Sequence, residues 1–534
     1  MGALTDADAS AKSNPFNPIP ADGIAPDVGP PQAAPAATRS LTQQAAAGFA
    51  WALTQSLGLK VAGIAGQIVL ARLLVPEHFG VVAVAQGVAG VAQVLQWTGV
   101  QDVLIKRQKR FDLWSTPAFW LSASMGVCAA LMLAVAGPIL AYALKQPQLT
   151  ALLLVLSIAN LAGILGVVPQ AKLQSELRFR SMVIPAMLSQ LAIVGLSIAL
   201  AWMGFGPYSL VIPQALCVPA MTLAYWRASG LRVAPRPHFR RWRFMVADSI
   251  VLMAIALTGS LAATAGTMAL AAIHDAKEVG YYSMGYNLSL QTVMVISGPL
   301  AAVLFPSLAR LQHDPPRLLA AFVRASRMLA LVGVPLCLAQ AVAARPGMEL
   351  LFGHKWDNAI PVTELLSVGL AFAVLGGVSA SIFKALGRFR ELLWWTVAIS
   401  LVQVAMLATG AAIGNSSYVA VAALLFYATC GPAGTLLGIW PLGGRLSHLW
   451  KIFGPPMLIG LGAAGAAWWA GHFFDGPTTQ ARLLRLVVVV AVMGAIYIPA
   501  ARFLQPEPYR ELMERMLSYT PRPLRPLARR VSLL

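Results

Sequence analysis

The chain has 534 residues, of which 58% are apolar and only 11% are charged. Soluble domains carry about 25% charged residues, so this composition excludes a soluble enzyme, a disordered scaffold and a secreted disulfide module. The net charge of +19 lies mostly in short loops between apolar runs. This position indicates membrane topology and contacts with anionic lipid, not nucleic-acid binding. The four cysteines lie inside apolar runs without a Cys-x-x-Cys pair, so we expect no disulfide framework and no metal site.

Long apolar runs alternate with short connections from residue 41 onward, whereas residues 1–40 have no apolar run and are predicted to be a disordered cytoplasmic tail. A membrane-spanning helix needs about 20 apolar residues, and about 14 runs reach that length. The sequence therefore predicts an all-α polytopic membrane protein that ends in a basic cytoplasmic tail at 505–534. The expected spans are 44–70, 80–105, 116–143, 148–171, 183–204, 207–228, 245–272, 281–305, 320–344, 361–386, 391–413, 417–440, 452–474 and 483–504.

Basic residues are distributed unequally between the two sets of loops. Most lie in the loops that follow even-numbered spans, as in the segment Lys106–Arg110, and in the C-terminal tail. Because cytoplasmic loops are enriched in Lys and Arg, this bias predicts that both termini are cytoplasmic. The loops that follow odd-numbered spans hold only Arg72, Lys145, Lys277, Arg345, Lys355, Arg482 and Arg485.

A weak internal repeat relates spans 1–6 to spans 7–12. Gly80 and Gly280 coincide at an offset of 200, and Arg178-Phe179-Arg180 recurs as Arg388-Phe389-Arg390. Each pair falls at the same place in the predicted topology, so the two copies share one orientation. Such parallel repeats predict two lobes that rock about a central cavity. The expected parts are lobes at 41–230 and 231–440, followed by two extra helices at 441–504.

Several motifs resemble the polysaccharide transporter family, the Wzx-like oligosaccharide-lipid flippases of the multidrug/oligosaccharidyl-lipid/polysaccharide (MOP) export superfamily. The matches run in family order over residues 45–395. They are LARLLVPEHFGVVAVAQGVAGVAQVLQWTGVQDVLIKRQ (70–108), LQSELRFRSM (173–182), VGYYSMGYNL (279–288), VLFPSLARLQ (303–312), LLFGHKWDNA (350–359) and KALGRFRE (384–391).

This resemblance implies two pseudo-symmetric six-helix lobes arranged as a V, plus two C-terminal helices. It implies a flippase, not an enzyme, that moves an undecaprenyl-pyrophosphate-linked oligosaccharide across the bacterial inner (cytoplasmic) membrane without a cofactor. Membrane lipids and a polysaccharide polymerase or export machinery are the implied partners. Family members often carry an Asp in span 7, at about the position of Gly266 in this sequence. The coupling ion therefore stays open.

Lys60 is the clearest candidate for binding the pyrophosphate, because a cation inside a span is costly and points to function. The alternative is a lysine that snorkels to a polar surface. Arg72, in the hairpin after span 1, would receive the phosphates at the outer mouth or serve as an interfacial anchor. Arg324 and Arg327 would be its inner counterparts, or ordinary topology signals.

Amide side chains are the candidates for binding sugar hydroxyls. Gln86 and Gln93 lie seven residues apart in span 2, and Asn287 and Gln291 lie four apart in span 8, so each pair shares one helix face. The alternative role is hydrogen bonding between helices. At the level of the whole protein, a drug or metabolite exporter of the same superfamily is the main alternative, and a membrane enzyme of glycan assembly is the next.

Overall fold

The computed structural model describes residues 62–96, 100–101, 104, 111–235, 242, 250–309, 311, 313–476 and 478–519. All of the described residues belong to one compact unit. Every regular element in these residues is a helix, as the composition predicts. Lys60 and the predicted disordered tail lie outside the described residues.

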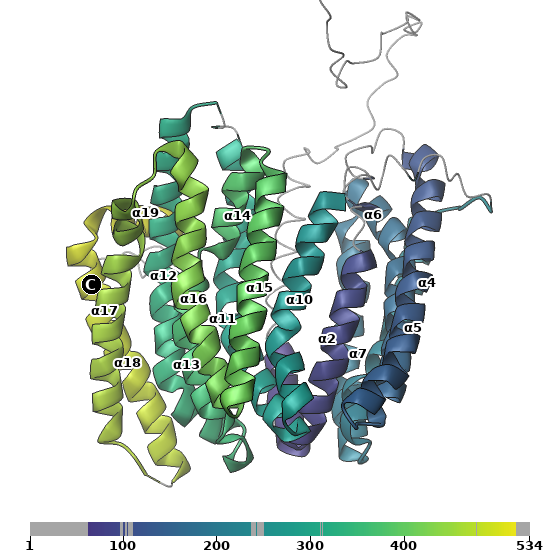
Figure 1. Ribbon diagram of the computed structural model, residues 1–534, viewed down its shortest axis with the longest axis horizontal. Coiled ribbons are helices and arrows are strands. Elements are labelled where there is room, and N and C mark those ends of the chain that lie inside the picture. Colours follow the sequence, from purple (N-terminus) through teal and green to yellow (C-terminus); the bar gives the residue numbers. More distant parts are fainter. Residues whose placement is uncertain are drawn as a thin grey trace, which may run out of the picture. The chain divides into compact units, whose positions relative to one another are not determined.

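The long helices run side by side in Figure 1, and the described residues form the following helical elements. They are Ala62–Leu73, α2 (Pro76–Gln96), α4 (Phe111–Ala143), α5 (Gln148–Leu165), α6 (Val167–Ser175), α7 (Phe179–Trp202), η2 (Gly206–Leu210), α8 (Ile212–Ser229), α10 (Ile250–Ile273), α11 (Ala276–Ala309), α12 (Pro315–Leu351), η3 (His354–Trp356), α13 (Ala359–Ala373), α14 (Gly376–Ala385), α15 (Phe389–Ile413), α16 (Ser416–Ile439), η4 (Trp440–Leu442), α17 (Leu446–His472), α18 (Thr479–Leu504) and α19 (Pro506–Tyr519).

Ten of the segments in the described part of the chain are long and apolar enough to cross a membrane. They match ten of the predicted spans, and the count of fourteen is not confirmed. The other four expected spans correspond to the helix Ala62–Leu73, to α2, to α11 and to the pair α13 and α14. Three of these four contribute polar side chains to a cavity described below, and the fourth is interrupted after Ala373.

The two Arg-Phe-Arg segments of the repeat have the same backbone conformation where they begin. Leu177 and Gly387 both have left-handed backbone angles, with φ of 55° and 69°. Arg178 and Arg388 then precede α7 and α15 with nearly equal angles, φ −82° and ψ 53° against φ −85° and ψ 51°. Two spans that differ in sequence therefore begin with the same turn.

The two halves of the repeat cross at a pair of glycines. A Cβ atom on Gly80 would lie 1.8 Å from the carbonyl oxygen of Ala276, and one on Gly280 would lie 2.0 Å from that of Pro76. These four positions are related by the same offset of 200 residues. Glu77 and Lys277, which the offset also relates, form an ion pair of 4.0 Å. The N-terminal turns of α2 and α11 are thus in reciprocal backbone contact, as expected for a two-fold repeat.

The last helices pack on the second half of the repeat. Helices α17 and α18 lie against α12 (Figure 1), and α18 contributes Val489, Met493 and Tyr497 to the largest buried cluster. The buried Arg485 donates a hydrogen bond to Asp475 (2.6 Å) in the connection between α17 and α18. Because a charge buried in a spanning helix requires a partner, this pair fixes the hairpin.

Candidate functional site

A cavity of about 320 Å³ lies among six helical segments. Each of three segments contributes a stripe with spacing i, i+3, i+4 and i+7, which is one face of a helix. The stripes come from the helix Ala62–Leu73, from α2 and from α7, and η2, α8 and α11 complete the wall. The lining residues are Gly63, Gly66, Gln67, Leu70, Phe79, Val82, Ala83, Gln86, Gln190, Ile193, Val194, Ser197, Leu210, Gln214, Ser283, Met284, Asn287 and Gln291.

Most of the polar side chains in this cavity are primary amides, so we call it the amide cavity. Gln291 donates to the side-chain oxygen of Gln67 (3.0 Å), which joins α11 to the first described helix. Asn287 donates to the carbonyl of Ser283 (2.9 Å), and Gln214 donates to that of Leu210 (3.0 Å). Each primary amide has two N–H donors and an oxygen that can accept two hydrogen bonds. Several amide donors and acceptors are therefore left for a ligand.

Three of the predicted sugar-binding residues, Gln86, Asn287 and Gln291, are brought together in the amide cavity. Gln93 is exposed and is not among the lining residues. Sequence reasoning missed Gln67, Gln190 and Gln214. A signal for Gln67 was present, because Gly63, Gly66 and Gln67 follow Lys60 at helical spacing.

Arg72 lies beyond the amide cavity, at the end of the first described helix. Its Nε donates to the carbonyl of Leu351 (2.7 Å) and its Nη2 to that of Leu350 (2.8 Å), the last two residues of α12. In return, Lys355 Nζ donates to the carbonyls of Arg72 (2.7 Å) and Leu74 (2.6 Å). These bonds use the Arg72 side chain within the protein, so in this structure it is not free to receive phosphate.

Trp356 completes this set of contacts. Its indole Nε1 donates to the carbonyl of Ala71 (2.9 Å), and its ring is fully buried. The ring packs edge-to-face on Phe79, with centroids 5.2 Å apart. We call the hydrogen bonds made by Arg72, Lys355 and Trp356 the latch, because they join the two halves of the repeat.

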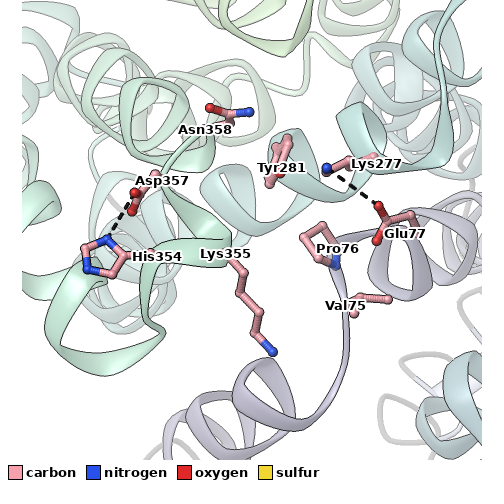
Figure 2. A pocket seen from close by; sticks show the side chains of 9 residues that line it. All are labelled: Val75, Pro76, Glu77, Lys277, Tyr281, His354, Lys355, Asp357 and Asn358. Atoms are coloured by element: carbon pink, nitrogen blue, oxygen red, sulfur yellow. Dashed lines mark hydrogen bonds and ion pairs between the residues drawn. The ribbon is translucent and has the colours of Figure 1, made fainter.

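A smaller pocket of about 300 Å³ adjoins the latch. Figure 2 shows Lys355 pointing from its turn toward the first half, while the side chains of Glu77 and Lys277 face each other on one side of the pocket. His354 and Asp357 form a second pair (3.2 Å). Burial lowers the pKa of the Lys355 ammonium, and the two carbonyl oxygens that it contacts offset this loss of hydration. The charged groups of this pocket are thus largely paired with one another or with backbone.

The position of the missing acid in α10 is occupied by a neighbour. A Cβ atom on Gly266 would lie 2.4 Å from the hydroxyl oxygen of Tyr282, which is buried. The Tyr282 ring also stacks on Tyr286, with centroids 6.1 Å apart. A carboxylate at residue 266 would therefore require the Tyr282 side chain to move.

The two arginines expected near the inner face are also paired. Arg324 forms an ion pair with Glu511 of α19, and Arg327 lies 3.6 Å from Glu507 of the same helix. The two pairs dock α19 on α12, so the structure assigns these arginines a packing partner within the chain.

The comparisons with known proteins agree with this architecture. The model of the family described as polysaccharide biosynthesis proteins matches residues 69–361, more than half of the chain. The lipopolysaccharide biosynthesis protein WzxC of Escherichia coli is 25% identical over 362 residues, which cover 65% of this chain and 71% of that protein.

Among solved structures, the lipid II flippase MurJ in an inward closed conformation has a TM-score of 0.67 at 12% identity, covering 87% of this chain and 100% of that one. An inward-facing multidrug resistance transporter of the MOP superfamily has a TM-score of 0.59 at 17% identity, covering 74% and 96%. The chain thus shares the fold of these two transporters. Together with the motifs at 70–108 and 279–288, the matched model shows that the chain belongs to the family of polysaccharide biosynthesis proteins.

Proposed function

We propose that this protein is a flippase that moves an undecaprenyl-pyrophosphate-linked oligosaccharide, the precursor of an exopolysaccharide, capsule or O-antigen, across the bacterial inner membrane. The observation that carries this proposal is the amide cavity, which helices of both halves form in a chain of the polysaccharide biosynthesis family. Sugar hydroxyls both donate and accept hydrogen bonds, and primary amides do the same. The similarity to WzxC and to the lipid II flippase MurJ supports the same class of cargo.

Transport proceeds by alternating access of the two lobes, residues 41–230 and 231–440, about this cavity. The basic loops that follow even-numbered spans face the cytoplasm, together with both termini. The latch then lies at the opposite end, toward the outer leaflet. Polysaccharide polymerase or export machinery would receive the flipped product there.

Recognition of such a cargo is shared by six residues, four for the sugar and two for the pyrophosphate. Gln86, Asn287 and Gln291 bind sugar hydroxyls, and Gln93, two turns farther along α2, extends the path. Lys60 and Arg72 bind the pyrophosphate, because charge-assisted hydrogen bonds to phosphate are stronger than neutral ones. Arg72 becomes available for this task when its bonds to α12 open.

A drug or metabolite exporter of the same superfamily is the alternative. An exporter of cationic drugs requires an acid in its cavity to balance the charge of the cargo. The polar side chains that line the described cavity are amides and serines, which suit a glycan better than a cation.

The direct test measures where the lipid-linked sugar accumulates. The gene is deleted in its host, and undecaprenyl-pyrophosphate glycans are quantified in each leaflet with an impermeant sugar-oxidising label applied to spheroplasts. We expect an unlabelled, inward-facing intermediate that disappears when the gene is restored. A normal outward-facing pool, with the defect in a later modification, would instead favour a membrane enzyme.

Replacing Gln67 or Gln291 with Leu should slow flipping by roughly 10- to 100-fold at equal protein level. A sugar hydroxyl that loses its partner in the cavity costs about 1–3 kcal/mol, and about 1.4 kcal/mol corresponds to tenfold in rate. The readout is the amount of outward-facing glycan in the complemented deletion strain. Gln403→Leu is the matched control, since Gln403 lies in α15 beside a different pocket. Equal rates for all three variants would remove the amide cavity from the transport path.

A further inference from the structure

The latch joins the carboxyl ends of two helices from different halves. Leu350 and Leu351 end α12, and Ala71 and Arg72 lie in the last turn of the helix Ala62–Leu73. The final carbonyls of a helix have no partner within it, and that end of the helix dipole is negative. Here each helix end receives its donors from the opposite half. The two ends thus cap each other, with Arg72 and Lys355 supplying the cations.

The latch lies directly beyond the amide cavity. Leu70 and Phe79 line the cavity, and the residues that follow Leu70, from Ala71 to Leu74, accept the bonds of Lys355 and Trp356. A buried cluster fills the space at this end. It contains Ala71, Tyr281, Met284, Met348, Phe352, Trp356, Ala359 and Ile360. Met284 belongs to both the cluster and the cavity wall.

The polar part of the latch is built to open. Arg72 is exposed and Lys355 is half-buried, and the acceptors are backbone carbonyls, so water can replace each bond when the helix ends separate. Trp356 differs, because it packs as an apolar side chain and makes a single hydrogen bond. The hydrogen bonds of Arg72 and Lys355 can thus hold this end of the cavity closed reversibly, and the Trp356 ring fills it.

We propose that Arg72, Lys355 and Trp356 form the gate that closes the amide cavity at this end, with Trp356 as the plug and the two cations as its fastening. This inference rests on the proposed transport function. In the cycle the bonds to Leu350, Leu351 and Leu74 break together, because both donors sit on the same pair of helix ends.

Access to the cavity tests the gate. The four native cysteines are replaced by serine or alanine, and Gln86→Cys is introduced into the cavity wall. Spheroplasts are then treated with an impermeant maleimide. Combining Arg72→Ala with Lys355→Ala should raise the labelling rate from outside at least tenfold. Lys145→Ala is the matched control, because Lys145 is an exposed lysine in another loop after an odd-numbered span and makes no described ion pair. An unchanged rate, at normal labelling after permeabilisation, would overturn the gate.

Locking the gate gives the opposite result. Val75, in the first half, and Asn358, in the second, line the same small pocket (Figure 2). Cysteines at both positions, joined by a short reducible cross-linker, should stop the appearance of outward-facing glycan, and reduction should restore it. Each single-cysteine variant should remain active under the same treatment. Continued transport in the fully cross-linked protein would contradict the proposal.

The two proposals fail in different ways. If the lipid-linked sugar is distributed normally in the deletion strain while the latch variants still open the cavity, the gate stands and the cargo is another molecule. If flipping is lost in the deletion strain but labelling does not respond to the latch, the flippase stands without this gate.

Discussion

Gly80→Ala and Gly280→Ala should each strongly destabilise the folded protein. The added methyl would lie 1.8 Å from the carbonyl oxygen of Ala276 in the first case and 2.0 Å from that of Pro76 in the second. Both obstacles are backbone atoms, so relief requires the two helices to move apart. Overpacking in well-packed sites typically costs about 1–3 kcal/mol, occasionally more, and we expect the upper end here. The measurement is the yield of monodisperse protein in detergent and its Tm.

Gly90→Ala is the control for this prediction, because Gly90 lies in α2 and a Cβ there meets no atom within 4 Å. It should leave Tm unchanged or raise it slightly, since Ala favours helix by up to about 1 kcal/mol over Gly. If Gly80→Ala and Gly90→Ala unfold at the same temperature, the close crossing of α2 and α11 is not a requirement of the fold.

Trp356→Ala should be the most destabilising truncation at the latch. The ring is fully buried, packs against Phe79 and Tyr281, and donates to the carbonyl of Ala71. Removing a buried Trp costs about 3–5 kcal/mol. Trp356→Phe retains most of the ring but loses the hydrogen bond, which contributes about 1 kcal/mol. Tm should therefore be highest for the wild type, lower for Trp356→Phe and lowest for Trp356→Ala.

Trp394→Ala provides the comparison, because 71% of the Trp394 side chain is exposed at the protein surface. It removes the same number of atoms without opening a cavity in the protein core. A loss of stability as large as that of Trp356→Ala would show that indole removal acts through the surrounding lipid or detergent, not through packing at the latch.

Much of the fold follows from hydropathy. Ten predicted spans have the required length and apolarity in the structure, and the offsets of 200 and 210 residues identify positions that share backbone geometry or contact each other. The interruption between α13 and α14 was not predicted. The run 361–386 is apolar throughout, and hydropathy does not distinguish one long helix from two short ones. For the same reason, hydropathy alone does not determine the number of spans.

The candidate site was predicted in part. Gln86, Asn287 and Gln291 were found because amides are conspicuous on apolar helices. Gln190 and Gln214 were missed because each is a lone amide in its span, and the sequence does not indicate that α7 and α8 line the same cavity as α2 and α11. The bonds of Arg72 were also beyond reach, since their acceptors are carbonyls at the end of α12. Every residue has a backbone carbonyl, so the residue type at a position does not reveal that its carbonyl accepts a hydrogen bond.

The glycine crossing has a mechanical consequence. Where α2 and α11 meet, backbone touches backbone at Gly80 and Gly280, with no side chain between them to compress. Sliding one helix along the other would drive a carbonyl oxygen into the next residue's Cβ, whereas changing the angle between the helices about the line joining the two glycines preserves both contacts. The crossing therefore resists sliding of one helix along the other but permits a change in the angle between them. A side-chain interface of the same size would yield in both directions.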